Sequence, residues 1–315
     1  MRVVDAAAVH AALGYASLTD ALAEAFRAGA VTPVRHHHPV TDEAGGPGTL
    51  LLMPAWQPGR SLGIKLVTVF AANADRGLPS VHATYLLLDG ETGAPRAVID
   101  GGALTERRTA AASALAAHYL AREDASRMLM VGAGALAPHL IRAHAATRDL
   151  REIRIWNRTA ARAEALAAAL AAEGYSATAT GDLEAAASWA GVISCATLAT
   201  APLIRGKWLR PGTHLDLVGA FRPDMREVDD TAVGRARIFV DVRESALAEA
   251  GDIAGPLARG IIAESDIAGD LTALVRDEVR GRRSDDEITL FKSVGSAIED
   301  LAAAQMVMET LDRGE

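Results

Sequence analysis

The stretch Met128–Leu140, MLMVGAGALAPHL, constrains the fold of this chain more than any other. An apolar run ends at two glycines, and an alanine-rich segment with helical character follows. This is the strand–turn–helix order of the G-x-G-x-x-G/A dinucleotide-binding fingerprint. The first glycine allows a tight turn, the second lets the backbone approach a pyrophosphate, and the small third residue lets helix and strand pack closely. We therefore expect the phosphates of a dinucleotide to be bound at Gly132, Gly134, Ala135 and Ala137.

Composition indicates a globular protein of about two domains. The 315 residues are 50% hydrophobic and 23% charged, which supplies ample material for a core. The formal net charge of −8 gives no support to nucleic-acid binding. A single cysteine, Cys195, excludes an internal disulfide and is interpreted as a small buried hydrophobe. The sequence has neither a signal-peptide pattern nor a long apolar span, so we expect a cytoplasmic protein that binds no membrane.

The first third of the chain predicts an antiparallel sheet. Residues 1–30 have helical periodicity and are expected to form a helical opening. Three segments rich in β-branched and apolar residues then follow, Ser61–Phe70, Val81–Leu88 and Arg96–Asp100, separated by short turn sequences. A long helix is expected to begin at Thr105.

From Met128 onward the pattern changes to alternating strands and helices, which predicts a doubly wound parallel sheet. The last stretch, residues 288–311, is predicted as a loop followed by an amphipathic helix. The predicted strands are Met128–Val131, Glu152–Trp156, Ser176–Thr180, Gly191–Ala196, His214–Val218 and Arg237–Val240.

The residues after the second of these strands favour NADPH over NADH. Enzymes that prefer NAD commonly place an acidic residue there for the ribose 2′-hydroxyl, but this chain has Asn157, Arg158 and Thr159. A guanidinium can pair with a 2′-phosphate. The alternative interpretation is a solvated arginine at the start of a helix. Thr197, at the end of a later strand, is also expected to contact the cofactor.

Several spaced motifs resemble the ornithine cyclodeaminase/μ-crystallin family over essentially the whole chain. The resemblance implies an α/β protein in which a Rossmann domain, residues 119–291, is inserted into a substrate-binding domain made of residues 1–118 plus 292–315. It also implies dimerisation through the sheet of the substrate-binding domain. The motifs are GIKLVTVFAAN, LDGETGAPRAVIDGGALTERRTAAASALAA, VGAGALA, IWNRT, SCATLATAPLI, FVDVRESALAEAGDI and ITLFKSVGSAIEDLAAA.

The resemblance also implies site residues. The family holds a substrate carboxylate with basic side chains, and the matching positions are Arg35, Lys65 and Arg108. An arginine can bind a planar carboxylate through two parallel hydrogen bonds. For each of the three, the alternative is a surface or structural charge. Thr109 is expected to face the cofactor phosphates.

The segment FKSVG lies where the chain crosses back between the domains. Ser293 and Gly295 are therefore expected near the nicotinamide, with interdomain packing as the alternative.

Two positions depart from the cyclodeaminase pattern. That pattern has a catalytic glutamate where this chain has Leu51, and an aspartate where this chain has Phe221. Neither side chain can transfer a proton. The segment GAFRPDMREVD instead resembles μ-crystallin and the bacterial pyrroline-2-carboxylate reductases, which reduce a preformed C=N bond. The proton on nitrogen is expected from solvent or a nearby group, and His82 is a candidate.

The sequence therefore predicts an NAD(P)H-dependent reductase of a cyclic ketimine acid, such as pyrroline-2-carboxylate. Alternatives are an NAD-dependent ornithine cyclodeaminase, an alanine dehydrogenase-like oxidoreductase, and an NADPH-bound ligand-binding protein without turnover. No metal site is expected, because consecutive histidines in an extended segment, such as His36–His38, point to alternate faces.

Overall fold

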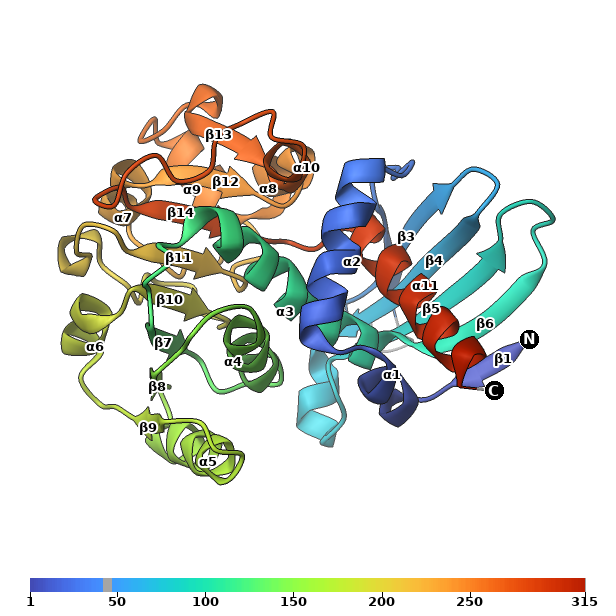
Figure 1. Ribbon diagram of the computed structural model, residues 1–315, viewed down its shortest axis with the longest axis horizontal. Helices are drawn as coiled ribbons and strands as arrows, with labels where there is room; N and C mark the ends of the chain where they lie inside the picture. Colours follow the sequence, from blue (N-terminus) through green and yellow to red (C-terminus); the bar gives the residue numbers. More distant parts are fainter. Residues whose placement is uncertain (42–46, 315) are drawn as a thin grey trace. The chain divides into compact units, whose positions relative to one another are not determined.

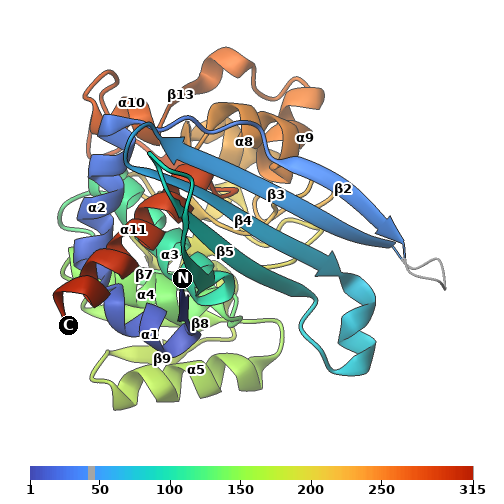
Figure 2. The same cartoon turned by 90° about the vertical axis from the view of Figure 1, so that its right-hand side faces the viewer.

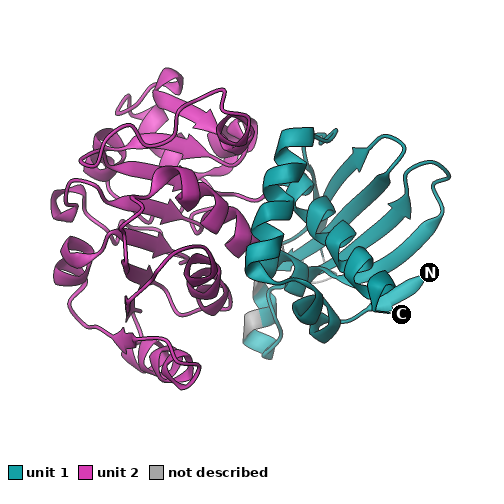
Figure 3. Ribbon diagram, viewed as in Figure 1, with its two compact units in different colours: residues 1–108, 296–315 teal, residues 109–295 magenta. Residues whose placement is uncertain are grey.

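The computed structural model describes residues 1–41 and 47–314, and it divides into two compact units (Figures 1 and 3). Unit 1 comprises residues 1–108 and 296–315, and unit 2 comprises residues 109–295. The first boundary lies inside helix α3 (Gly101–Leu120), whereas the sequence placed it near the end of that helix. The difference has a physical reason, because Arg108 pairs with residues of the C-terminal helix and so belongs with unit 1.

Unit 1 contains a six-stranded sheet in the order β1-β6-β5-β4-β3-β2. The first strand runs parallel to β6, and the other neighbours are antiparallel. The sequence did not predict β1, because the short run Arg2–Val4 precedes a strongly helical segment. The bounds are β1 Arg2–Val4, β2 His36–Thr41, β3 Pro47–Gln57, β4 Ser61–Phe70, β5 Val81–Asp89 and β6 Pro95–Asp100.

Three helices pack together in unit 1: α1 (Ala6–Ala12), α2 (Tyr15–Ala28) and α11 (Ala297–Arg313). Figure 2 shows α11 lying along β3, β4 and β5. Strand β4 alternates accordingly, with Gly63, Lys65 and Val67 buried and their neighbours more exposed. The face of β4 that carries Lys65 is therefore the face that α11 covers.

Unit 2 contains an eight-stranded sheet in the order β13-β12-β14-β11-β10-β7-β8-β9, and every neighbouring pair is parallel. The strand order reverses between β7 and β10, which is the switch point where doubly wound sheets bind nucleotides. The bounds are β7 Arg127–Val131, β8 Glu152–Trp156, β9 Ala177–Ala179, β10 Val192–Cys195, β11 His214–Leu217, β12 Arg237–Val240, β13 Ile267–Asp270 and β14 Thr289–Lys292.

Strand β14 corrects the sequence prediction, which made this segment a loop. Thr289–Lys292 lies between β11 and β12, and all four residues are buried. The prediction was wrong because a four-residue strand buried on both faces has no alternating pattern, and because a lysine stands at its end. Strand β13 was also not predicted, because it is only four residues long.

The helices of unit 2 flank this sheet, and apolar residues of successive strands form the core, including Leu129, Ile193, Leu215 and Leu290. None of the helices among the described residues combines the length and apolar character needed to cross a bilayer. The helices that lie wholly in unit 2 are α4 (Leu136–Thr147), α5 (Ala160–Ala172), α6 (Leu183–Trp189), α7 (Asp230–Arg235), α8 (Arg243–Glu249), α9 (Gly251–Ala258) and α10 (Leu271–Val275).

A buried polar network ties α4 to the sheet. The Asp216 carboxylate accepts a hydrogen bond from Ser194 Oγ at 2.6 Å and lies 3.2 Å from His144 Nε2. Burial raises the pKa of Asp216, but the contacts with His144 and Ser194 outweigh it and leave that pKa below its usual range. Because the serine donates to the aspartate and not to the histidine, this is a structural network and lacks the relay of a catalytic triad.

Candidate active site

Four buried charged side chains meet in unit 1. Lys65 Nζ, on β4, lies 2.7 Å from Asp300 Oδ2 on α11. Arg108, on α3, donates from Nε to Asp300 Oδ1 at 2.9 Å and from a terminal nitrogen to Glu299 Oε2 at 2.7 Å. None of the four is more than 4% exposed. We call Lys65, Arg108, Glu299 and Asp300 the cation cluster.

Local sequence explains this arrangement. Lys65 is paired across the sheet with Met53 on β3 and Tyr85 on β5, both buried, so its side chain leaves the sheet toward α11. Ser296 caps α11, which places Glu299 and Asp300 in the first helical turn. Carboxylates are stabilised there by the positive end of the helix dipole.

Burial and the neighbouring charges together set the pKa values of the cation cluster. Burial lowers the pKa of Lys65 to about 8, assisted by the nearby Arg108 charge and opposed by Asp300. Burial alone would raise the pKa of Asp300, but Lys65 and Arg108 keep it below its usual range. Asp300 is therefore ionised at neutral pH, while Lys65 can lose its proton at moderately alkaline pH.

Arg35, which precedes β2, contributes to the same electrostatic field. Its charge lowers the pKa of both Lys65 and Asp300. The structure thus brings the three basic positions expected from the sequence into one neighbourhood. It differs from expectation at Arg108, whose guanidinium already pairs with two carboxylates of the chain.

Glu299 and Asp300 were not predicted from the sequence. Both stand in SAIED, at the start of a helix whose buried face includes them. Acidic residues in a first turn are ordinary capping features, so the pattern alone gave no reason to assign them to the site. A signal did exist, because two buried cations require buried counter-charges.

In unit 2, the turn after β7 has the features of a phosphate-binding loop. Gly132 has a φ of +111°, and a Cβ atom on it would lie 2.6 Å from the carbonyl oxygen of Ala196. A Cβ on Gly134 would meet nothing within 4 Å, so the backbone there is open to a ligand. Ala137 is fully buried against the sheet.

Helix α4 begins directly after this turn, at Leu136, and its N-cap residue Ala135 makes no side-chain capping hydrogen bond. The first N–H groups of the helix therefore suit an anion. The glycines, the open backbone and the uncapped helix together fit the pyrophosphate of a dinucleotide.

The residues that the sequence predicts at the ribose of the cofactor follow β8. Asn157 donates from its side-chain nitrogen to the carbonyl oxygen of Thr159 at 3.0 Å, which shapes the turn. Thr159 is the N-cap of α5 but makes no capping hydrogen bond. Arg158 is exposed at the tip of the strand, as a residue that reaches a 2′-phosphate would be.

The segment after β14 is held by Asp241, the residue that follows β12. Its Oδ2 accepts from Ser293 Oγ at 3.1 Å and from the N–H groups of Val294 and Gly295 at 2.7 and 2.6 Å. Asp241 therefore positions Ser293 and Gly295 rigidly. Thr109, the first residue of unit 2, is buried on α3.

The other predicted residues lie as follows. Leu51 is paired with Val67 across the sheet, so it shares the sheet face of Lys65. His82 is paired with Thr68, is exposed, and lies on the opposite face. His82 therefore does not belong to the cation cluster. Phe221, after β11, is 42% exposed and so presents its ring to a ligand or to solvent.

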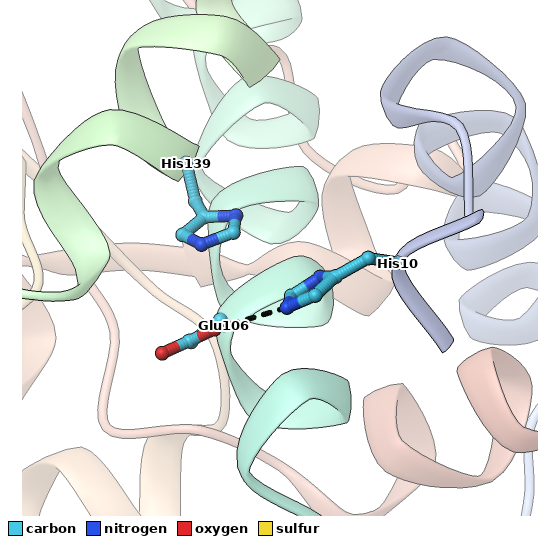
Figure 4. Close-up of side chains that lie close together, drawn as sticks. All are labelled: His10, Glu106 and His139. Atoms are coloured by element: carbon cyan, nitrogen blue, oxygen red, sulfur yellow. Dashed lines mark ion pairs between the residues drawn. The ribbon is translucent and has the colours of Figure 1, made fainter. Parts of the chain in front are cut away.

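His10 and Glu106 form a separate pair in unit 1 (Figure 4). The distance between His10 Nε2 and Glu106 Oε2 is 3.6 Å, and His10 Nδ1 accepts from Arg107 Nε at 3.0 Å. These contacts tie α1 to α3. His139, drawn in the same view, belongs to unit 2. The tract His36–His38 lies exposed on β2.

Comparisons with known proteins show which proteins this chain is similar to. The family model described as ornithine cyclodeaminase/mu-crystallin family matches residues 2–315. Δ1-pyrroline-2-carboxylate reductase from Paracoccus denitrificans is 41% identical over 303 residues, covering 95% of each chain.

Two solved structures are similar over the full length of this chain. One is Thermococcus litoralis Δ1-pyrroline-2-carboxylate reductase in complex with NADH and L-proline, with 32% identity, a TM-score of 0.93 and 98% of that chain covered. The other is an archaeal alanine dehydrogenase dimer with bound NAD, with 31% identity, a TM-score of 0.91 and 97% of that chain covered.

The cation cluster generates a prediction about stability. Replacing Asp300 by asparagine leaves Lys65 and Arg108 with less counter-charge, so Asp300→Asn should lower the free energy of unfolding by about 3–5 kcal/mol at pH 7. Urea unfolding of the cofactor-free protein, followed by circular dichroism, measures this. The control is Asp312→Asn, which removes a surface pair with Arg2 and should cost less than about 1 kcal/mol.

The same variant has a pH dependence of definite sign. A carboxylate with a lowered pKa stabilises the fold above its unfolded pKa of about 3.9, and this stabilisation disappears as pH falls through the folded pKa. The gap in stability between wild type and Asp300→Asn should therefore shrink below about pH 4. A gap that stays constant from pH 7 to pH 3 would contradict the ionised pairing.

Proposed function

Because this chain belongs to the ornithine cyclodeaminase/mu-crystallin family, we propose that it reduces the C=N bond of a cyclic ketimine acid with a nicotinamide cofactor. The substrate class we favour is Δ1-pyrroline-2-carboxylate and its ring homologues, which would yield proline or its homologues. The observation that carries this proposal is that two apolar residues, Leu51 and Phe221, occupy the positions that bear acids in cyclodeaminases.

The basic side chains around Lys65 support a substrate that carries a carboxylate. Lys65, Arg108 and Arg35 bring three positive charges into one neighbourhood, and Glu299 and Asp300 bring two negative ones. The carboxylate of an α-imino acid is complementary to the three basic side chains. Burial of the cluster strengthens such an interaction, because the effective dielectric constant falls away from water.

Lys65 is the proton donor that we propose. Its ammonium group is buried, and the pKa of about 8 places it near the pH at which a general acid works best. When bound, the cofactor supplies the hydride; the chain must then hold the carboxylate and deliver one proton to nitrogen. His82, the earlier candidate, is exposed on the other face of the sheet.

We also propose a cofactor preference and an oligomeric state. Arg158, with no acid beside it, favours NADPH over NADH, although the similar structures hold NADH or NAD. A homodimer in the cytoplasm is the form that we propose for the active protein, since the similar alanine dehydrogenase is a dimer. Leu66, 38% exposed on the sheet face opposite Lys65, suits such an interface.

Substrate assays test the reaction. The purified protein should oxidise NADPH with Δ1-pyrroline-2-carboxylate, and its kcat/KM should exceed that for ammonia release from ornithine with NAD by at least about a hundredfold. The reason is that deamination with ring closure needs proton transfer at two amines, while a preformed imine needs one proton. Comparable kcat/KM values would favour the cyclodeaminase instead, and cofactor binding without turnover would favour a ligand-binding protein.

The pH profile tests Lys65. We expect kcat for imine reduction to fall about tenfold per pH unit above about pH 8, as the ammonium group loses its proton. Lys65→Arg should move this fall out of the accessible range, because a guanidinium keeps its proton, and should lower kcat by about 10²–10⁴-fold. Lys207→Arg, at an exposed position, is the control and should leave the profile unchanged. An identical alkaline limb in Lys65→Arg would remove Lys65 from this role.

Cofactor selectivity tests Arg158. The wild type should prefer NADPH over NADH by about ten- to a hundredfold in kcat/KM, the factor implied by a charge-assisted contact of about 1.5–3 kcal/mol. Arg158→Ala should abolish most of this preference, whereas Arg162→Ala, exposed on the following helix α5, should preserve it. An unchanged ratio in Arg158→Ala would show that the arginine is merely a solvated surface charge.

A further inference from the structure

A second group of buried charges lies in unit 2, and the proposed reaction makes no use of it. It consists of Glu227, before α7, Asp252, in α9, and Lys292, at the end of β14. All three side chains are fully buried. We call them the strand-end cluster, because their contacts lie at the carboxyl ends of β10 and β11.

Glu227 braces the ends of two strands. Its Oε1 accepts from the N–H of Thr197 at 2.7 Å and from Thr197 Oγ at 2.8 Å. A Cβ atom on Gly219, beyond the end of β11, would lie 2.3 Å from the same oxygen and 2.4 Å from the carbonyl oxygen of Thr197. The carboxyl group therefore fills the space between the segments that follow β10 and β11.

Thr197 in turn touches the phosphate-binding turn. A Cβ atom on Gly132 would lie 3.2 Å from Thr197 Cγ2 and 2.6 Å from the carbonyl oxygen of Ala196. The position of Thr197 thus limits how closely the first fingerprint glycine packs on the sheet. Glu227 acts on this turn through one intervening residue.

Lys292 is hydrogen-bonded to the end of β11 and to the segment after it. Its Nζ donates to the carbonyl oxygen of Leu217 at 3.1 Å and to that of Gly219. The chain has 32 lysines and arginines, of which only Lys65, Lys207 and Lys292 are lysines. Two of these three are the buried ones, which agrees with a need for a compact ammonium group where the planar fork of an arginine would not fit.

The two carboxyl groups of the cluster are incompletely satisfied. Asp252 Oδ1 accepts from the N–H groups of Glu227 and Val228 at 2.9 and 3.2 Å. Within the described residues, Glu227 Oε2 and Asp252 Oδ2 have no hydrogen-bond partner. A buried carboxylate oxygen without a donor is costly, and a proton on one of the two groups removes much of that cost.

The surrounding charges favour that proton on Glu227. Burial raises the pKa of Glu227 to about 7, with Asp252 adding to the effect and Lys292 opposing it. Burial also raises the pKa of Asp252, but Asp252 has two backbone donors and the nearby Arg226 to support its charge. The charged or titratable groups around the pair are Arg226 on the same loop, Lys292 on β14, Cys195 on β10 and Asp216 on β11.

We propose that Glu227 is a positioning residue for the dinucleotide and that it works as the neutral acid. Its carbonyl-like oxygen Oε1 fixes Thr197 and the ends of β10 and β11, and the proton resides on Oε2. Ionisation of Glu227 would place a second negative charge beside Asp252 and disturb the contact between Glu227 and Thr197. Dinucleotide binding should therefore weaken as Glu227 loses its proton. The inference rests on the cofactor-binding part of the proposed function.

Glu227→Gln is the decisive variant, because an amide resembles the neutral acid: one oxygen accepts from Thr197 and the NH₂ group replaces the O–H. We expect Glu227→Gln to bind NADH within about threefold of wild type at pH 6, and its Kd to stay constant up to pH 8. The wild-type Kd should rise about tenfold between pH 6 and pH 8, the effect of one proton leaving a group with a pKa of about 7. NADH fluorescence without substrate measures both, and Glu173→Gln, at an exposed ion pair, should keep the wild-type profile.

The cofactor-free protein provides a second readout. A group whose folded pKa is raised contributes stability that is present below its unfolded pKa of about 4.3 and is lost as pH rises through the folded value. The melting temperature of wild type should therefore fall relative to that of Glu227→Gln between pH 5 and pH 7.5. Thr197→Val, which removes the hydroxyl donor, should raise the NADH Kd about three- to tenfold at pH 6.

The results distinguish failure of the proposed function from failure of the inference about Glu227. Failure of the wild type to bind NADH or NADPH at any pH would overturn the proposed function. If wild type binds, the inference fails in any of three cases: Glu227→Gln binds at least tenfold more weakly at pH 6, wild type and Glu227→Gln share one pH profile, or Thr197→Val binds like wild type.

Discussion

The pairing of Lys65 and Arg108 with Asp300 is the interaction on which unit 1 depends. Arg108 and Asp300 are 192 residues apart in the sequence, because the whole of unit 2 lies between them. Closing so long a loop costs entropy, although the cost grows only slowly with length. Removing one partner would leave a buried charge without its counter-charge. The pairing therefore joins the two chain segments of unit 1, and it belongs to the site at which we propose that a substrate carboxylate binds.

The two units solve the problem of a buried lysine in different ways. In unit 1, Lys65 is balanced by the Asp300 carboxylate, while burial and Arg108 still lower its pKa to about 8. In unit 2, Lys292 donates to backbone carbonyl oxygens, and its charge opposes the effect of burial on the pKa of Glu227. In the first arrangement Lys65 can lose its proton at moderately alkaline pH, and in the second Lys292 contacts the end of β11. Lysine suits both, because its single ammonium group can be directed at one point.

Periodicity predicted much of the fold, and local motifs predicted the cofactor turn, because both depend on neighbours in sequence. The strand Ser61–Phe70 and the turn at Gly132 lie as expected. The fully buried strand β14 could not be predicted, since its short apolar run lacks alternation. Glu299 and Asp300 were missed for another reason. A buried counter-charge is defined by what folds against it, and a single sequence does not record that.

The absence of an acid at Leu51 is consistent with the chemistry of the cation cluster. Leu51 shares the sheet face of Lys65, so a glutamate there would add negative charge on that face. Such a charge would raise the pKa of Lys65, because it stabilises the ammonium form, and would repel the carboxylate of a substrate. A cyclodeaminase gains from a second proton-transfer group at the ornithine amines, but an imine reductase needs a cation that gives up one proton near neutral pH. An apolar leucine preserves that condition.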